Sequence, residues 1–294
     1  SGDKPFIMRQ QITSDTSQVN SILGSIPLHY GGDGPESSME ALYQGATGAG
    51  YDQSCDSGYN SDTDVLPFLA DTTDPFGGSG GESYDSSFAG GGYIGGFGFR
   101  DYSLPVLVFA TDYDLRDPDA GYGTPGGCPF SAGASDVTSA VTDIGARLIG
   151  LSVNSSTPVS QMNALADSTG SYADTDGDGS IDDRLVFTWS GSSSSFRSTV
   201  VSAIQALVNA VEFDTVELIV DGDTEGFVRS FSPASYTGVS VTAGSTVTLD
   251  FSIELQALIA GAPDDRIYSV DLYAIGDGTV ALAHVNLLIL VPGI

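Results

Sequence analysis

The chain has 294 residues, and its 38 Asp and Glu against 9 Lys and Arg give a net charge of −29. This imbalance excludes nucleic acid and anionic membrane surfaces as partners, because both are bound through clustered basic side chains. No run of 18 apolar residues is present, so no direct membrane insertion is predicted. The acidity, with abundant Gly, Ser and Asp, instead favours a secreted protein that binds hard cations through oxygen ligands.

Strand-like and helix-like patterns alternate over residues 1–211. A short apolar strand is predicted at 6–12, and residues 13–15 offer the N-cap of a helix with apolar residues at helical spacing. Another helix is predicted over 37–44. Further strands are predicted at 104–110, 148–153 and 185–189, and further helices at 135–147, 158–168 and 195–211. The alternation predicts an α/β domain built on a doubly wound, mostly parallel sheet.

Residues 45–103 interrupt this alternation, because Gly, Ser, Asp and Tyr dominate them. A loop of this length is expected to be functional or tied down, and we interpret it as an insertion lying over an acidic site. The two cysteines of the chain, Cys55 and Cys128, both lie in Gly-rich loops. A single disulfide between them is favoured; the alternatives are two free thiols or pairing with another chain.

Helical periodicity stops after residue 211. Alternating or continuous apolar segments follow, rich in β-branched residues and separated by Gly- and Asp-containing turns. These segments lie at 216–220, 239–241, 246–253, 267–275 and 285–291. The sequence therefore predicts a second, all-β domain over 212–294, with a sandwich as the favoured architecture.

Three carboxylates lie where an α/β sheet usually binds its ligand, beyond the carboxyl ends of strands. Asp33 and Glu36 belong to the acidic turn at 31–36, and Asp112 follows the apolar run at 104–110. Carboxylates from several loops suit Mg²⁺ or Ca²⁺. The alternatives are that Asp33 is a turn residue, Glu36 a partner of the helix dipole and Asp112 a solvated strand end.

The segments around these carboxylates carry a longer pattern. Residues 11–15 lead into 31–44, in which Asp33, Pro35, Glu36, Ala41 and Gln44 stand at fixed spacing; residues 107–112 read L-V-F-A-T-D. The pattern resembles the von Willebrand factor A-type domain in its integrin β-subunit I-like form, and the later elements to about residue 211 fit that family's layout. In that family an L-T-x-D stretch leads to N-x-D-x-P-E-G-G-x-D-A-x-x-Q.

The resemblance implies two neighbouring metal sites. Glu36 and Asp112 would belong to the metal-ion-dependent adhesion site, which would hold Mg²⁺ or Ca²⁺. Asp33, Glu36 and the Pro35 carbonyl would belong to the adjacent synergistic site. Gly31 stands where the family has a ligating Asn, which weakens or alters that second site, and Ser37 and Ser38 replace two glycines.

The family's D-x-S-x-S motif, which ends its central strand, has no counterpart before residue 6. The nearest match, residues 52–56, lacks the final Ser and follows no apolar strand, so we reject it. The A-like sheet is therefore expected to be incomplete at its amino end. The missing half of the adhesion site would come from upstream polypeptide, for example a cleaved N-terminal segment that stays bound.

A second acidic loop begins at residue 174, where D-T-D-G-D-G-S-I-D-D has the spacing of a calcium loop. The predicted ligands are Asp174, Asp176, Asp178, the Ser180 carbonyl and Asp182, and either Asp182 or Asp183 could complete the sphere. Leu185 replaces the bidentate Glu of an EF-hand, so the loop, 174–185, resembles those of extracellular Ca²⁺ modules. The alternative is an acidic turn without an ion.

No catalytic set of Ser, His and Asp or of Cys and His stands out, and only two His are present, so an enzyme is not predicted. The leading hypothesis is a metal-dependent adhesion module that binds a protein ligand through its carboxylate, outside the cell or on its surface, by analogy in a bacterium. The alternative is a structural subunit that contacts neighbouring subunits of an extracellular assembly, with Ca²⁺ serving folding only. A metal-dependent hydrolase is the third reading.

Overall fold

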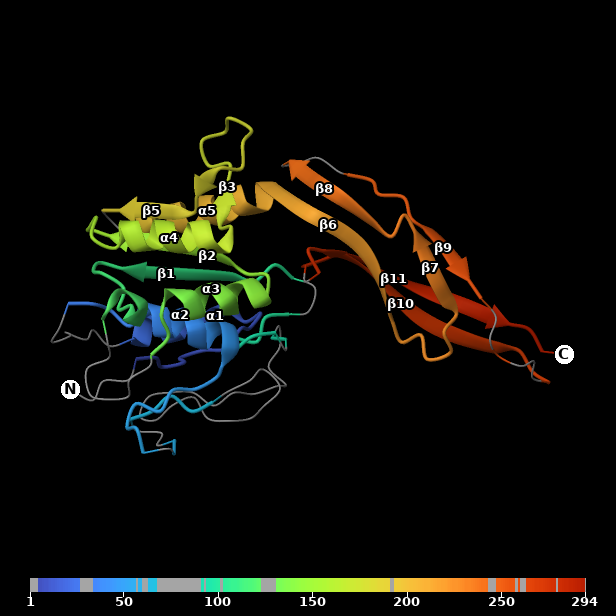
Figure 1. The fold of residues 1–294 in the computed structure, drawn as a ribbon, viewed down its shortest axis with the longest axis horizontal. Helices are drawn as coiled ribbons and strands as arrows, with labels where there is room; N and C mark the ends of the chain where they lie inside the picture. The colour runs from blue at the N-terminus through green and yellow to red at the C-terminus, as the bar shows by residue number, and fades with distance from the viewer. Residues whose placement is uncertain are drawn as a thin grey trace. The chain divides into compact units, whose positions relative to one another are not determined.

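The protein is a mixed α/β chain that divides into two compact units (Figure 1). Unit 1 comprises Ser1–Asp101 and Pro105–Gln205, and unit 2 comprises Tyr102–Leu104 and Ala206–Ile294. The sequence prediction set the boundary at 211, where the last helix was expected to end. The computed structural model describes residues 5–26, 34–56, 58–59, 63–67, 91–92, 94–100, 103–122, 131–190, 193–242, 247–256, 259, 263–278 and 280–293.

Unit 1 contains a three-stranded parallel sheet of order β1-β2-β5. The strands are β1 Val106–Thr111, β2 Arg147–Val153 and β5 Val186–Trp189. Each coincides within two residues with a predicted strand, because continuous apolar runs of this length suit the buried strands of a parallel sheet. Parallel strands also place their carboxyl ends at one edge of the sheet, which is where Asp112 follows β1.

The strand predicted at 6–12 is wrong, since these residues form no strand. Their apolar side chains pack instead, with Met8 buried among Tyr51 and Val65, and Phe6 beside Phe97. An apolar pattern predicts an extended segment, but a strand also needs regular backbone pairing with a neighbouring strand, which the pattern alone does not report.

Helices cover one face of this sheet (Figure 1). They are α2 Ser38–Thr47, α3 Ala134–Asp143 and α4 Val159–Thr169. Their apolar residues share a core with Leu107 of β1 and Leu148 of β2, which lie opposite one another in register. Helix α1 Thr16–Ser25 begins as predicted, since the Asp15 carboxylate accepts hydrogen bonds from the N–H groups of Ser17 and Gln18. None of the described helices is long and apolar enough to cross a membrane.

Part of the predicted insertion at 45–103 belongs to the core of unit 1. Its described residues beyond α2 form two isolated backbone bridges, Tyr51 with Val65 and Ile94 with Phe99, and Phe99 is buried against the helices. The glycine-rich segment passes close to α2 at Gly96, where a Cβ would lie 2.1 Å from the Gln44 carbonyl oxygen. Glycine is therefore needed where this segment crosses the end of α2.

Unit 2 consists of antiparallel strands. A four-stranded sheet has the order β11-β10-β6-β8, and β7 pairs with β9 in a second sheet. Phe231 of β7 packs on the same core as Val270 of β10 and Leu287 of β11, so the two sheets share apolar contacts. The strands are β6 Ala210–Asp221, β7 Val228–Ser232, β8 Ser235–Thr242, β9 Ser252–Leu255, β10 Arg266–Gly276 and β11 Val280–Val291.

The strand predictions for unit 2 hold with two differences. The segment predicted at 246–253 becomes a strand only at its end, in β9, and β7 was not predicted at all. The helix α5 Ser193–Asn209 runs directly into β6, which is why the sequence set the domain boundary a few residues too late.

Candidate metal sites

The predicted adhesion segments lie side by side. The Glu36 N–H donates to the Asp114 carbonyl at 2.8 Å, and the Arg116 N–H donates to the Glu36 carbonyl at 2.7 Å. Glu36 is exposed just before α2, and Asp112 is exposed just after β1. Asp33 lies outside the described residues. The two segments are therefore joined by backbone hydrogen bonds, and Glu36 and Asp112 belong to no group of three converging ligands among the described residues.

A positive charge lies beside the Pro35 carbonyl, which the resemblance assigned to a metal ion. Arg116 is buried, and its Nη2 donates to the Pro35 oxygen at 3.1 Å. Repulsion between this guanidinium and a divalent cation opposes binding of the ion to the same oxygen. The sequence pattern gave no signal for Arg116, because its contact with Pro35 joins residues 81 positions apart.

The acidic loop at residue 174 closes a short hairpin. Strands β3 Tyr172–Ala173 and β4 Asp183–Arg184 pair antiparallel on either side of it. Fully buried Ala173 and Leu185 fix the ends of the hairpin in unit 1. Leu185 thus fills the position of the missing EF-hand Glu because it is a core residue.

Hydrogen bonds wrap this loop around the carboxylate of Asp174. Its Oδ1 accepts from the Gly177 N–H at 2.7 Å and its Oδ2 from the Gly179 N–H at 3.0 Å. Both glycines have positive φ, +82° and +90°, which side chains disfavour. Asp183 Oδ2 accepts from the backbone N–H and the hydroxyl of Thr175, at 2.9 and 2.8 Å.

One oxygen atom from each of Asp174, Asp176 and Asp183 lies within 4.8 Å of the others. Two of the predicted ligands, Asp174 and Asp176, thus lie close together. The sequence left a choice between Asp182 and Asp183, and Asp183 is the residue that joins them. Asp178 and Asp182 lie outside this group, and the Asp178 Oδ1 accepts from the Ser180 N–H at 2.8 Å. We call the three converging residues the hairpin carboxylates.

The hairpin carboxylates suit a hard cation. The Thr175 hydroxyl, and then its backbone N–H, lower the pKa of Asp183, which keeps this carboxylate ionised. The loop carries five Asp within ten residues, and the neighbouring Arg184 is already paired with Asp167. The arrangement concentrates oxygen ligands and negative charge at one point of an anchored hairpin.

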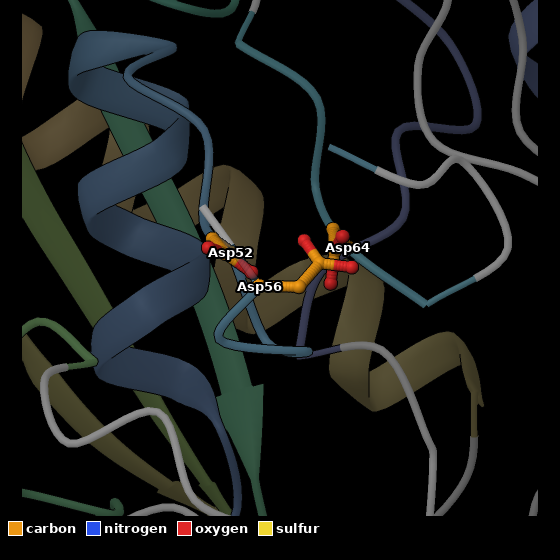
Figure 2. A group of neighbouring side chains, drawn as sticks. All are labelled: Asp52, Asp56 and Asp64. Carbon is orange, nitrogen blue, oxygen red and sulfur yellow. The ribbon is translucent and has the colours of Figure 1, made fainter. Parts of the chain in front are cut away.

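A second group of converging carboxylates was not predicted from the sequence. Asp52, Asp56 and Asp64 each offer an oxygen within 4.8 Å of the others, in the segment that follows α2 (Figure 2). Buried Asp64 accepts from the Ser54 N–H at 2.8 Å. The Tyr51–Val65 backbone bridge joins the two stretches involved. Two of its members, Asp52 and Asp56, lie in the stretch 52–56 that was rejected as a match to D-x-S-x-S, and nothing in the sequence linked Asp64 to them.

Next to this group, Cys55 is disulfide-bonded and has a φ of +61°. Cys128, the other cysteine of the chain, lies outside the described residues. Figure 2 draws the three Asp side chains gathered where this segment folds back. Among the described residues, three or more potential metal ligands converge in two places: at these three Asp residues and at the hairpin carboxylates.

The chain matches no family model and no curated protein sequence.

Proposed function

We propose that the chain is an extracellular module stabilised by calcium, with one Ca²⁺ held by the hairpin carboxylates. The observation that carries this proposal is the convergence of Asp174, Asp176 and Asp183 in a loop whose glycine N–H groups hold the Asp174 carboxylate in place. Ca²⁺ fits because it takes carboxylate, carbonyl and water oxygens in flexible geometry. The group contains no His or Cys, which softer metals prefer.

The role proposed for the ion is structural. The hairpin joins α4 to β5, so an ion that cancels repulsion among its carboxylates stabilises the edge of the parallel sheet. This favours a structural subunit of an extracellular assembly that contacts neighbouring subunits. A disulfide-bonded Cys55 supports an oxidising, extracellular or bacterial cell-surface location.

The von Willebrand factor A-like fold, with its doubly wound sheet, and the sandwich of unit 2 are part of the proposal. A sheet of three parallel strands that alternate with helices along the chain supports the first, together with the match over 31–44. The apolar contacts between the two sheets of unit 2 support the second.

Metal-dependent adhesion is the second candidate function. The pairing of Glu36 with Leu115 favours it, because it holds exposed Glu36 at the edge of the sheet where Asp112 lies. Mg²⁺ or Ca²⁺ there would accept the carboxylate of a protein ligand. Arg116 at the Pro35 carbonyl counts against the adjacent second ion.

Thermal unfolding with and without Ca²⁺ tests the structural role. Trp189, the only Trp of the chain, ends β5 and lies edge-on to Phe196, so its fluorescence reports on unit 1. Ca²⁺ at about one hundred times its Kd stabilises by about 2.7 kcal/mol, a rise in Tm of roughly 5–10 °C for a unit of this size. Equal Tm values in Ca²⁺ and in EDTA would contradict the proposal.

A further inference from the structure

Strand β11 is an edge strand whose one irregularity is a bulge at Leu282, where its register with β10 shifts. It lies at the end of the sheet order β11-β10-β6-β8, and among the described strands it pairs with β10 alone. Its 12 residues, V-A-L-A-H-V-N-L-L-I-L-V, include no Lys, Arg, Asp, Glu or Pro. Edge strands are normally shortened, charged, bulged or covered, because their free N–H and C=O groups otherwise pair with another chain.

The outward face of this edge is apolar at one end. Leu288 and Leu290 of β11 are 65% and 59% exposed, and Ile267 of β10, opposite Leu290 in register, is 71% exposed. The inward residues of β11, such as Leu287 and Ile289, pack on the core of unit 2. The outward side chains are therefore not needed for that core, and they form a continuous patch that favours association.

The polar residues in the middle of β11 are satisfied within the same unit. His284 Nε2 and Asp271 Oδ1 lie 2.9 Å apart, and Asn286 Nδ2 donates to the same oxygen at 2.8 Å. The His284 ring also stacks on Tyr273, with centroids 4.6 Å apart. An incoming strand therefore leaves these side-chain contacts in place, and it gains backbone hydrogen bonds and apolar contacts.

We propose that β11 pairs antiparallel with β11 of a second copy of this chain, which extends the sheet across a two-fold axis. Each copy carries a net charge of −29, so like charges oppose the approach of two copies over most of their surface. Strand β11 has no charge and thus allows an equally acidic chain to approach. A basic partner, in contrast, would be attracted to the acidic surfaces rather than to this strand.

The sequence of β11 suits self-pairing. Placing Asn286 opposite its own copy sets His284 opposite Leu288, both on the outward face, and it sets Leu290 opposite the bulge at Leu282. Residues directly opposite in an antiparallel pair share a face and make contact. The exposed Leu288 of one copy then contacts the His284 side chain of the other.

Sedimentation equilibrium of the whole chain tests this dimer. We expect a monomer–dimer equilibrium in which the dimer fraction rises from about 0.05 to about 0.5 M NaCl, because salt screens the repulsion between copies. Leu288→Lys should raise the dimer Kd at least about tenfold. Val247→Lys, which changes another exposed apolar residue of unit 2, should leave the Kd unchanged.

A second pair of variants tests the register. Asn286→Cys should form a disulfide-linked dimer under mild oxidation, since the two copies of this residue face one another, and Leu282→Cys should not. A chain that stays monomeric at both salt concentrations would overturn the proposal. A dimer that Leu288→Lys leaves intact, or one that crosslinks in the Leu282→Cys variant and not in the Asn286→Cys variant, would overturn it as well, and neither outcome bears on calcium binding.

Discussion

Glu40 is a buried carboxylate that ties α2 to the start of α3. Its Oε1 accepts from Gln44 Nε2 and its Oε2 from the Ala132 N–H, both at 2.7 Å. Burial raises the pKa of Glu40, and the two hydrogen bonds oppose this rise only in part. Because the folded pKa lies above the unfolded one, the contribution of Glu40 to stability is full below the unfolded pKa and is lost as the pH rises through the folded pKa.

The variant Glu40→Gln tests this linkage. Gln cannot ionise, so the free energy of unfolding of the wild type should fall relative to that of the variant as the pH rises from about 4 to 7. Urea titrations at several pH values measure this difference. A difference that stays constant over the range would show that Glu40 has the same pKa in both states.

At the scale of single residues, the sequence predicted the helix cap at Asp15 and the closeness of Asp174 to Asp176, because these contacts are local. Asp15 caps α1 from within three residues, and Asp174 reaches only to Gly177 and Gly179. The sequence did not predict the contacts of Arg116 or Asp64, because the fold brings their partners from distant parts of the chain. The choice between Asp182 and Asp183 also stayed open, because it depends on how the β3–β4 hairpin pairs.

At the scale of elements, the close approach of residues 94–100 to α2 is the feature most sensitive to substitution. A Cβ at Gly96 would lie 2.1 Å from the Gln44 oxygen and 2.6 Å from the Gly48 nitrogen, both backbone atoms. Gly96→Ala should therefore destabilise the protein by about 1–3 kcal/mol, measured by urea unfolding.

Gly24→Ala is the matched control, since Gly24 lies in α1 and a Cβ there meets nothing within 4 Å. Alanine is the better helix former by about 0.5–1 kcal/mol, so this variant should be slightly more stable. If both alanine variants destabilised the protein equally, the close approach at Gly96 would not be the cause.

Helices and strands were predictable where the pattern of apolar residues within one segment is enough to define them. Strands β1, β2 and β5 are continuous apolar runs, and α3, α4 and α5 have apolar residues at helical spacing, so their positions follow from the sequence. Residues 6–12 carry a strand pattern but form no strand, and β7 carries a weak pattern and pairs with β9. Pairing is a tertiary property, and one-dimensional periodicity does not report it.

At the scale of the whole molecule, charge dominates. With 38 acidic side chains, the chain attracts divalent cations over its entire surface, so weak Ca²⁺ binding alone does not identify a site. A decisive comparison must hold the net charge fixed and change only the position of the carboxylate. The adjacent residues Asp182 and Asp183 allow this, because only Asp183 belongs to the hairpin carboxylates.

Calorimetric titration of the metal-free chain with Ca²⁺ makes that comparison directly. Asp183→Asn should weaken the tightest Ca²⁺ site at least about tenfold, which corresponds to about 1.4 kcal/mol, whereas Asp182→Asn, with the same loss of charge, should leave its affinity unchanged. Equal effects of the two variants, or a loss of binding with Asp182→Asn alone, would contradict a calcium site built on Asp174, Asp176 and Asp183.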